Sequence, residues 1–399
     1  MSEVANIPQL RFSEFSGEWE EKKLGELCKF TQGVQIPFSE QLTKYKEGAI
    51  RYLYIRDFFT DDFPYYVKDQ YPNKVIHTDE IMMVNTGNTA GKAFMGATGV
   101  LSNNAFKVSF DKTKVSNIFL FQRITSDTIQ RRIKSFFNAG GQPHLGHKNI
   151  AIIPMGFASL KEQQKIAVFL SAVDNKIEQL SKKQELLGEY KKGLMQKIFS
   201  QAIRFKADDG SEFPDWEEKK LGDLIAEISD GGTPPTSNKG NFGGGINWVV
   251  IDDIRDEIRI TKETLTETGL SNSSSKLWKP ETIILSTGAT IGRVGIAKIY
   301  TTTKQGVCGI VVNQFTSNLF LKYWFIFNIN LLKRFSQGSS IKEVRPPTLI
   351  KFDISTPSLP EQTKIANFLS SIDSKIEQVG KQLDESKQFK KALLQQMFV

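Results

Sequence analysis

Residues 160–180 read LKEQQKIAVFLSAVDNKIEQL, and residues 359–379 read LPEQTKIANFLSSIDSKIEQV. The two segments lie 199 residues apart and are identical at 14 of 21 positions. Such similarity between two distant parts of one chain indicates an internal repeat, here with a period of about 200 residues, and repeats of this kind decide the architecture. The chain is therefore predicted to be one unit written twice.

Each segment opens a run of apolar residues that alternates steps of four and three. In the first copy these residues are Ile166, Leu170, Val173, Ile177, Leu180, Leu187, Leu194 and Ile198, interrupted by Gln184 and Lys191. In the second copy they are Ile365, Leu369, Ile372, Ile376, Val379, Leu383, Leu393 and Met397, interrupted by Ser386 and Lys390. A 3.5-residue apolar period is typical of a coiled-coil seam. At 1.5 Å per residue, a helix of roughly 40 residues is about 60 Å long.

The two predicted helices carry matching start signals and matching seams. Ser159 precedes Glu162 by three residues, and Ser358 precedes Glu361 by three, which predicts a capping box at each start. Because a narrow apolar seam is not stable in water, the two helices are predicted to pack on each other about an approximate two-fold axis. If they are antiparallel, the globular parts lie at opposite ends of a rod. Alternatively, each helix packs on its own domain or on another protein.

Three further blocks repeat in the same order. Residues 19–27 return at 216–224, residues 50–57 at 246–253, and residues 86–91 at 287–292. Between them, short β-type runs alternate with glycine-rich turns, which predicts an α+β domain before each long helix. The predicted boundaries are 1–158 for the first globular domain, 159–199 for a central helix, 200–357 for the second globular domain and 358–399 for a C-terminal helix.

The composition describes a globular protein with a modest positive charge. The 399 residues include 52 Lys and Arg against 44 Asp and Glu, a net charge of +8, and 39% hydrophobic residues. The most apolar stretch, residues 319–332, is too short for a membrane span, which needs about 20 residues, so no membrane association is expected. No secretory signal is visible, and the two cysteines are too few for a disulfide framework. A cytoplasmic location is predicted.

The motifs that carry catalytic chemistry are either missing or incomplete. Residues 87–92 resemble a phosphate-binding loop but have three residues between the glycines, where the motif needs four. Residues 214–219 combine acids with a lysine, yet the carboxylates are too close in sequence for a metal nuclease, and a solvated charged turn is expected. His144 and His147 have no nearby zinc-binding partner. The sequence therefore predicts no catalytic residues, no cofactor and no metal site.

Positive charge is concentrated in one stretch of each repeat. Residues 123–148 carry a net charge of +4, and residues 322–351 carry +5. Each stretch flanks a polar, glycine-containing loop, at 138–142 and 336–340. Lys and Arg bind phosphates, Arg also binds guanine, and Asn and Gln suit adenine edges. A DNA-binding face is predicted in each repeat, the alternative being an ordinary solvated surface.

Candidate DNA-binding residues come from these stretches, from the glycine turns and from the exposed-looking loop 230–238. They are Lys92, Arg131, Arg132, Lys134, Gln142, His144 and Lys148 in the first repeat, and Thr233, Asn238, Arg293, Lys333, Arg334, Gln337, Ser339, Lys342 and Arg345 in the second.

Several motifs together resemble one known family. They are the Trp-x-x-x-x-Leu-Gly openings at 19–25 and 216–222, the segment 231–253, the Thr-Gly-x-Thr-x-Gly turns, and the Leu-x-Glu-Gln-x-Lys-Ile-Ala-x-Phe-Leu helix starts. In this combination and order the chain resembles the specificity (S) subunits of type I restriction-modification systems. One departure is residues 31–37, TQGVQIP, where the second repeat has the fuller GGTPPT motif, so the first repeat is expected to contact DNA differently.

The resemblance implies a non-catalytic DNA-recognition subunit. It implies two target-recognition domains separated by a pair of long antiparallel helices, each domain binding one half of a bipartite, asymmetric double-stranded DNA target. Two methyltransferase (M) subunits would dock on the helices and the Trp-Glu-Glu openings, and restriction (R) subunits would join the full complex. S-adenosylmethionine, ATP and Mg²⁺ would belong to those partners. The alternatives are a stand-alone DNA methyltransferase or nuclease, and a structural coiled-coil scaffold.

Overall fold

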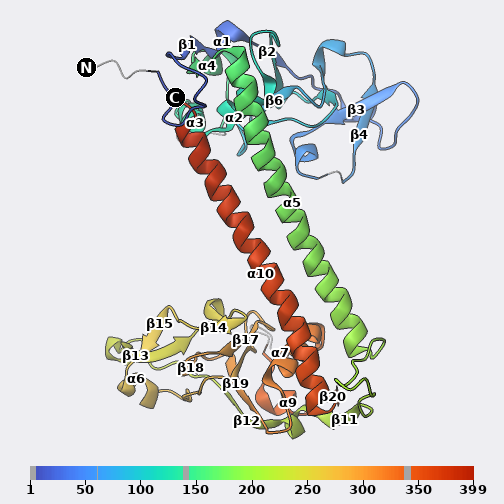
Figure 1. The fold of residues 1–399 in the computed structure, drawn as a ribbon, viewed down its shortest axis with the longest axis vertical. Helices are drawn as coiled ribbons and strands as arrows, with labels where there is room; N and C mark the ends of the chain where they lie inside the picture. The colour runs from blue at the N-terminus through green and yellow to red at the C-terminus, as the bar shows by residue number, and fades with distance from the viewer. Residues whose placement is uncertain (1–5, 61, 138–142, 337–342) are drawn as a thin grey trace. The chain divides into compact units, whose positions relative to one another are not determined.

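The computed structural model describes residues 6–60, 62–137, 143–336 and 343–399. The chain forms two compact units, which are described separately (Figure 1). Unit 1 contains Met1–Lys182 and Gly380–Val399, and unit 2 contains Lys183–Val379. Each unit therefore combines parts of both sequence repeats.

Unit 1 contains three small sheets and a set of short helices. The strands are β1 (Glu20–Lys23), β2 (Cys28–Gln32), β3 (Ala49–Leu53), β4 (Tyr65–Lys68), β5 (Val75–Ile76), β6 (Ile81–Val84), β7 (Ala93–Phe94), β8 (Gly99–Leu101), β9 (Ala105–Phe110) and β10 (Pro154–Phe157). The helices are α1 (Leu24–Leu27), α2 (Asn117–Thr125), α3 (Asp127–Lys134), α4 (His147–Ala151) and the start of α5 (Leu160–Phe199). The sheet orders are β1-β10, β2-β9-β6-β7 and β4-β3-β8-β5.

Unit 2 repeats this plan. Its strands are β11 (Glu217–Lys220), β12 (Ile225–Asp230), β13 (Phe242–Val249), β14 (Glu257–Ile258), β15 (Glu263–Leu265), β16 (Ile283–Ser286), β17 (Val294–Ala297), β18 (Thr301–Thr303), β19 (Val307–Val312) and β20 (Asp353–Thr356). Its helices are α6 (Glu267–Ser271), α7 (Asn318–Phe327), α8 (Ile329–Arg334) and α9 (Pro346–Leu349), together with the end of α5 and the start of α10 (Leu359–Gln396). The sheet orders are β11-β20, β12-β19-β16-β17-β14 and β15-β13-β18. The predicted α+β class and internal repeat are confirmed.

The Trp-Glu-Glu openings form strands, so the predicted charged turn is wrong. Residues Glu20–Lys23 pair antiparallel with β10, and Glu217–Lys220 pair in the same way with β20. Trp19, just before β1, is buried in the core of unit 1. A charged strand is tolerated here because three of its four side chains are exposed and the fourth is half-buried, while its backbone completes a two-stranded sheet directly before the long helix.

The two long helices are present, with 40 residues in α5 and 38 in α10. In unit 1, Ile166 and Leu170 of α5 share a core with Leu393 of α10. In unit 2, Ile198 of α5 shares a core with Ile365 of α10. The start of one helix therefore packs with the end of the other in each unit, which is an antiparallel pairing. The predicted seam residues are buried or half-buried throughout.

Equivalent ion pairs join the helices in both units. In unit 1, Lys390 Nζ lies 2.6 Å from Asp174 Oδ1, and Gln122 donates to the other carboxylate oxygen at 2.7 Å. In unit 2, Lys191 Nζ lies 2.5 Å from Asp373 Oδ1, and Tyr323 donates to the second oxygen at 2.7 Å. The polar seam positions Lys191 and Lys390, which interrupt the apolar repeat, thus hold an aspartate on the partner helix.

We expect Lys191→Met to destabilise unit 2 more than Lys390→Met destabilises unit 1. Lys191 is the more buried lysine and its ammonium lies 5.0 Å from the ring centre of Tyr323, which adds a cation–π contact. The expected losses are about 1–2 kcal/mol for Lys191 and below about 1 kcal/mol for Lys390. Hydrogen exchange of peptides from each unit measures both values in one protein. Equal losses would show that the ring contact adds nothing.

The capping box predicted at Ser159 is half correct, and the one predicted at Ser358 is wrong, because the buried Ser358 hydroxyl has no hydrogen-bond partner within the described part of the chain. Ser159 Oγ accepts the backbone N–H of Glu162 at 3.4 Å, but the Glu162 carboxylate binds Arg11 through two hydrogen bonds of 2.7 and 2.8 Å and also accepts the indole N–H of Trp19 at 3.3 Å. In unit 2, Glu361 binds Arg204 in the same way. The glutamates therefore anchor the segment before each first strand onto the long helix. These hydrogen bonds raise the pKa of both guanidinium groups.

The adjacent glutamines make a second anchor. Gln163 Oε1 accepts the backbone N–H of Ser116 at 2.9 Å, and its amide donates to the carbonyls of Lys114 and Ala158. Gln362 makes the equivalent bonds to Ser317, Phe315 and Pro357. Both glutamines are buried. The Glu-Gln pair in each helix start is thus explained by contacts that position the globular part against its helix.

Candidate nucleic-acid interface

Four separate parts of the chain meet at one polar place in each unit, which we name the turn site. In unit 1 it contains residues 32–35, 85–87, 103–105 and 143–145. Backbone bonds close it: Gly33 donates to Ala105 at 2.9 Å, Asn85 to Asn104 at 3.0 Å, and Leu145 to Asn85 at 2.7 Å. In unit 2 the turn site contains residues 230–233, 287–288, 305–307 and 343–345. The turn that follows β6 or β16 lies at its centre.

Unit 2 repeats these backbone bonds in the same order. Gly231 donates to Val307, Thr287 to Gly306, and Val344 to Thr287, each at 2.9 Å. These bonds place Thr287 at the position of Asn85, whereas the two Thr-Gly motifs align Thr287 with Thr86. The turn of unit 1 is therefore one residue longer than the turn of unit 2. The predicted strand–turn–strand is otherwise confirmed in both units.

Glycine is required at the end of each turn. Gly91 has φ of +84° and Gly292 has φ of +97°, a region that other residues rarely adopt. A Cβ at Gly91 would also lie too close to Ile133, and one at Gly292 too close to Ile329. The turn of unit 1 therefore packs against α3, and the turn of unit 2 packs against α8. These helices carry much of the predicted positive charge.

The turn site of unit 1 is rich in amide side chains. Asn85 donates to Gln32 Oε1 at 3.1 Å, and Asn103 donates to Gln35 Oε1 at 3.4 Å. His144 Nδ1 lies 3.1 Å from Thr86 Oγ1, the polar loop contact that was expected for this histidine. Of this group only His144 was predicted from the sequence. Gln32, Gln35 and Asn103 lie far apart in the chain, and no local signal marks them.

The turn site of unit 2 has two carboxylates where unit 1 has an amide and an imidazole. Asp230 takes the position of Gln32, and Glu343 takes the position of His144. Burial raises the pKa of Asp230, and the nearby Glu343 carboxylate raises it further. Arg345 donates to Glu343 at 3.3 Å and remains largely exposed. The two units thus present different hydrogen-bonding groups on the same backbone frame.

We expect Asp230→Asn to stabilise unit 2 at neutral pH. A carboxyl whose pKa is raised on folding costs stability once it ionises, so the wild type loses stability relative to the variant as the pH rises through the raised pKa. Below the ordinary value of 3.8 the carboxyl is protonated in both states and the difference disappears. Thermal melts from pH 3 to pH 8 measure the difference in Tm, which should grow as the pH rises above 3.8 and level off above the raised pKa. A difference that is equal at the acidic and neutral ends of this range would contradict this assignment.

The basic helix α3 packs directly on the turn of unit 1. Gln130 donates to the carbonyl of Gly91 at 3.0 Å. Arg131 and Lys134 are exposed, whereas the guanidinium of Arg132 donates to the carbonyl of Pro154 at 2.7 Å and is partly occupied by that bond. Lys148, in α4, is exposed as well. The structure therefore brings most of the predicted cations of this repeat beside the turn site.

In unit 2 the corresponding cations are Lys333 and Arg334 at the end of α8, and both are exposed. Lys92 is exposed in the turn of unit 1. Its equivalent, Arg293, donates to Asp252 at 3.0 Å and to the carbonyl of Ile251 at 3.1 Å. Arg293 therefore already has a partner within the protein.

Two charges that contributed to the predicted basic stretches are buried, so that part of the prediction is wrong. Arg123 is 2% exposed, donates to the Val399 oxygen at 2.6 Å and packs on Phe398. Burial, with a smaller contribution from nearby Arg132, lowers the pKa of Arg123 to about 9. Lys322 is 1% exposed and forms an ion pair with Asp256. Both face the protein interior because α2 and α7 pack against the long helices.

The loop at 230–238 is less exposed than expected. Gly231, Gly232 and Pro234 are buried, and Thr233 is half-buried. The indole of Trp248 donates to the carbonyl of Gly232 at 3.2 Å, as Tyr52 donates to Val34 in unit 1. Only the second half of the loop is exposed, and there Asn238 accepts the backbone N–H of Gly240. The first half of this motif is therefore a packing element.

Four predicted residues lie outside the described parts of the chain: Gln142, Gln337, Ser339 and Lys342. Within the described ranges, no group of three His, Cys, Asp or Glu is placed to bind a metal ion. Burial raises the pKa of Cys28 to about 12 and that of Cys308 well above its ordinary value, so both thiols stay protonated at neutral pH. None of the helices in these ranges is long and apolar enough to span a membrane.

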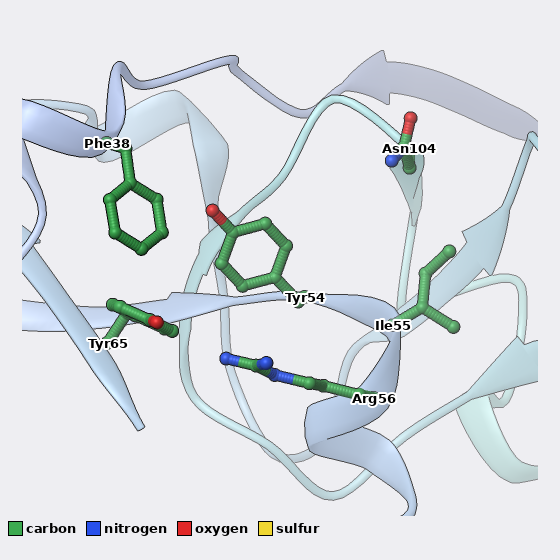
Figure 2. A pocket seen from close by; sticks show the side chains of 6 residues that line it. All are labelled: Phe38, Tyr54, Ile55, Arg56, Tyr65 and Asn104. Atoms are coloured by element: carbon green, nitrogen blue, oxygen red, sulfur yellow. The ribbon is translucent and has the colours of Figure 1, made fainter. Parts of the chain in front are cut away.

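One open pocket borders the turn site of unit 1 (Figure 2). It has a volume of about 420 Å³ and is lined by Phe38, Tyr54, Ile55, Arg56, Tyr65 and Asn104. Asn104 belongs to the turn site itself, so the pocket and the turn site form one surface. Sequence reasoning did not identify this pocket, because its lining comes from four separate segments.

Comparisons with known proteins agree with this arrangement. A family model described as the type I restriction modification DNA specificity domain matches residues 16–187 and 214–386. The type I restriction enzyme MjaVIII specificity subunit of Methanocaldococcus jannaschii is 26% identical, over 94% of this chain and 91% of its own. The MjaIX specificity subunit of the same organism is 36% identical, over 46% and 44% of the two chains.

Two solved structures share the fold. The type I restriction-modification S subunit from M. genitalium has a TM-score of 0.63 at 14% identity, covering 98% of this chain and 99% of its own. A chain from a study of complex assembly and conformational transition of a type I R-M system has a TM-score of 0.58 at 17% identity, covering 94% and 96%.

Proposed function

Because this chain belongs to the family of type I restriction-modification DNA specificity proteins, we propose that each of its two units binds one half of a bipartite, asymmetric double-stranded DNA target. The chain is a specificity subunit, a DNA-recognition protein that does not itself catalyse a reaction. A stand-alone methyltransferase or nuclease and a purely structural scaffold find no support in the comparisons.

The turn site carries this proposal. It occurs once in each unit on the same backbone frame, beside exposed cations, but Gln32 and His144 of unit 1 are replaced by the carboxylates of Asp230 and Glu343 in unit 2. Amides pair well with adenine edges, and carboxylates accept from the amino group of cytosine. Two turn sites with the same backbone arrangement but different side chains would recognise two different half-sites. The cations on α3 and α8 would hold phosphates and position each unit.

We propose two methyltransferase subunits as partners, with restriction subunits joining the full complex. Two grooves at equivalent places support a pair of docking sites. One lies between α5 and α7–α8 in unit 2 and includes Lys191 and Met195; the other lies between α10 and α2–α3 in unit 1 and includes Lys390 and Leu394. S-adenosylmethionine, ATP and Mg²⁺ would be bound by the partners. The complex would act in the cytoplasm, where its DNA is.

Methylome sequencing tests this function. Cells that express the chain with its methyltransferase partner are expected to carry adenine methylation at one bipartite motif with unlike halves. The chain alone, incubated with DNA and labelled S-adenosylmethionine, is expected to transfer no methyl group. Methylation by the isolated chain, or a motif with a single uninterrupted half, would contradict the proposal.

A further inference from the structure

The pocket beside the turn site of unit 1 has a rigid aromatic wall. The hydroxyl of Tyr54 donates to Gln41 at 2.8 Å, and its backbone N–H donates to Asp57 at 2.7 Å. The rings of Tyr54 and Tyr65 meet edge to face, with centres 5.9 Å apart. These bonds and contacts hold both rings in place before any ligand arrives.

The guanidinium of Arg56 packs against both rings of this wall. Its guanidinium carbon lies 5.4 Å from the ring centre of Tyr54 and 5.1 Å from that of Tyr65, and it also donates to the carbonyl of Phe63 at 3.3 Å. Figure 2 shows the guanidinium extending beneath Tyr54 toward Tyr65. Much of its hydrogen-bonding and stacking capacity is therefore used within the protein.

Two exposed side chains, the ring of Phe38 and the amide of Asn104, lie on opposite sides of the pocket (Figure 2). Phe38 is 68% exposed although it packs on Tyr65, which is unusual for a large apolar side chain. Across the pocket, Figure 2 shows the amide of Asn104 near Ile55. The backbone carbonyl of Asn104 is bonded to Asn85 in the turn site, while its exposed side chain makes no hydrogen bond within the described part of the chain.

Unit 2 has no equivalent of this pocket wall. The matching block of the repeat places Val250 where unit 1 has Tyr54, and Asp252 where it has Arg56. Asp252 forms an ion pair with Arg293 instead. The pocket is therefore a feature of one half of the protein, as expected for a group that distinguishes one half-site from the other.

We propose that this pocket reads one A·T base pair in the major groove of the half-site bound by unit 1. The 5-methyl group of the thymine would enter the pocket between Phe38, Tyr54 and Ile55, and the amide of Asn104 would bond N6 and N7 of the paired adenine. Apolar contacts recognise the thymine methyl, and an asparagine amide matches the adenine edge. No carboxylate lines the pocket to accept from cytosine, and Arg56 is engaged with the tyrosines.

This inference rests on the proposed function. DNA that carries base analogues distinguishes a failure of the pocket assignment from a failure of the proposed function. In the assembled methyltransferase complex, deoxyuridine replaces each thymine of both half-sites in turn, which removes only the methyl group. At one position we expect about fourfold weaker binding, the value of one buried methyl group. Phe38→Ala should weaken binding to thymine DNA by a similar factor and abolish the further effect of deoxyuridine there. At the paired base, 7-deazaadenine should weaken the wild type but not Asn104→Ala.

Tyr45→Ala is the matched control, because Tyr45 is 65% exposed and packs on Tyr66 outside the pocket. This variant should keep the full deoxyuridine effect. If no position couples to Phe38, or if Phe38→Ala couples instead to 7-deazaguanine, the pocket assignment is wrong while sequence-specific binding stands. If the complex shows no sequence-specific binding at all, the proposed function itself fails.

Discussion

Replacing Glu162 by alanine is expected to destabilise unit 1 by about 3 kcal/mol. The carboxylate is 2% exposed and is bonded to Arg11, which is itself 13% exposed, and to the indole of Trp19. Removing one partner of a buried ion pair leaves the other charge without compensation, which typically costs about 3–5 kcal/mol. The partly accessible guanidinium places the expected loss at the lower end of that range. The free energy of unfolding of unit 1 peptides, measured by hydrogen exchange, tests this value.

Two further variants show whether the ion pair is responsible. Glu162→Gln keeps an acceptor for Trp19 and Arg11 but removes the charge, so its loss should be smaller. Glu178→Ala changes an exposed glutamate of the same helix and should cost less than about 0.5 kcal/mol. A loss from Glu162→Ala no larger than that of Glu178→Ala would show that this anchor contributes nothing.

Removing four cations beside the two turn sites should weaken DNA binding strongly. The variant combines Arg131→Ala, Lys134→Ala, Lys333→Ala and Arg334→Ala, four exposed residues on α3 and α8. If each holds one phosphate, the slope of log K against log salt should fall by about 0.9 per residue, and affinity at moderate salt should fall by about 10²–10³-fold. Titration of labelled target DNA with the assembled complex at several salt concentrations measures both quantities.

A charge-matched variant separates local contacts from net charge. Lys176, Lys183, Lys375 and Lys381 are exposed on α5 and α10, and their replacement by alanine removes the same four charges. We expect a much smaller change in both slope and affinity, provided that the complex still contains its methyltransferase subunits. Equal losses in the two variants would place the DNA face elsewhere.

The long helices show what a local pattern can predict. The 3.5-residue period and the 199-residue spacing predicted α5 and α10, and the structure confirms both, with the seam residues buried or half-buried. The period is a property of neighbouring residues, so it is visible without knowledge of the fold. The first capping box was half correct and the second was wrong, because Glu162 and Glu361 bind Arg11 and Arg204, which lie about 150 residues away in the chain, and Ser358 caps nothing among the described residues.

The turn site was predicted in part. The glycine turns and the adjacent cations have local signatures, and the structure places most of them together. The amides Gln32 and Asn103 were missed, because strand pairing joins them across about 70 residues. Arg123 and Lys322 were counted as surface charges, although each lies on the covered side of a helix. A count of charges along the chain cannot distinguish the buried side of a helix from its exposed side.

The duplication, the two helices and their seams are therefore determined by the sequence alone, because spacing and periodicity are local properties. The tertiary structure decided which charges face solvent and which side chains meet at each turn site. It also decided that Phe38, Tyr54, Tyr65 and Asn104 of unit 1 line one pocket. These features depend on burial and on contacts between distant segments, and folding alone brings those segments together. The same backbone frame, built twice, can thus carry two different sets of hydrogen-bonding groups.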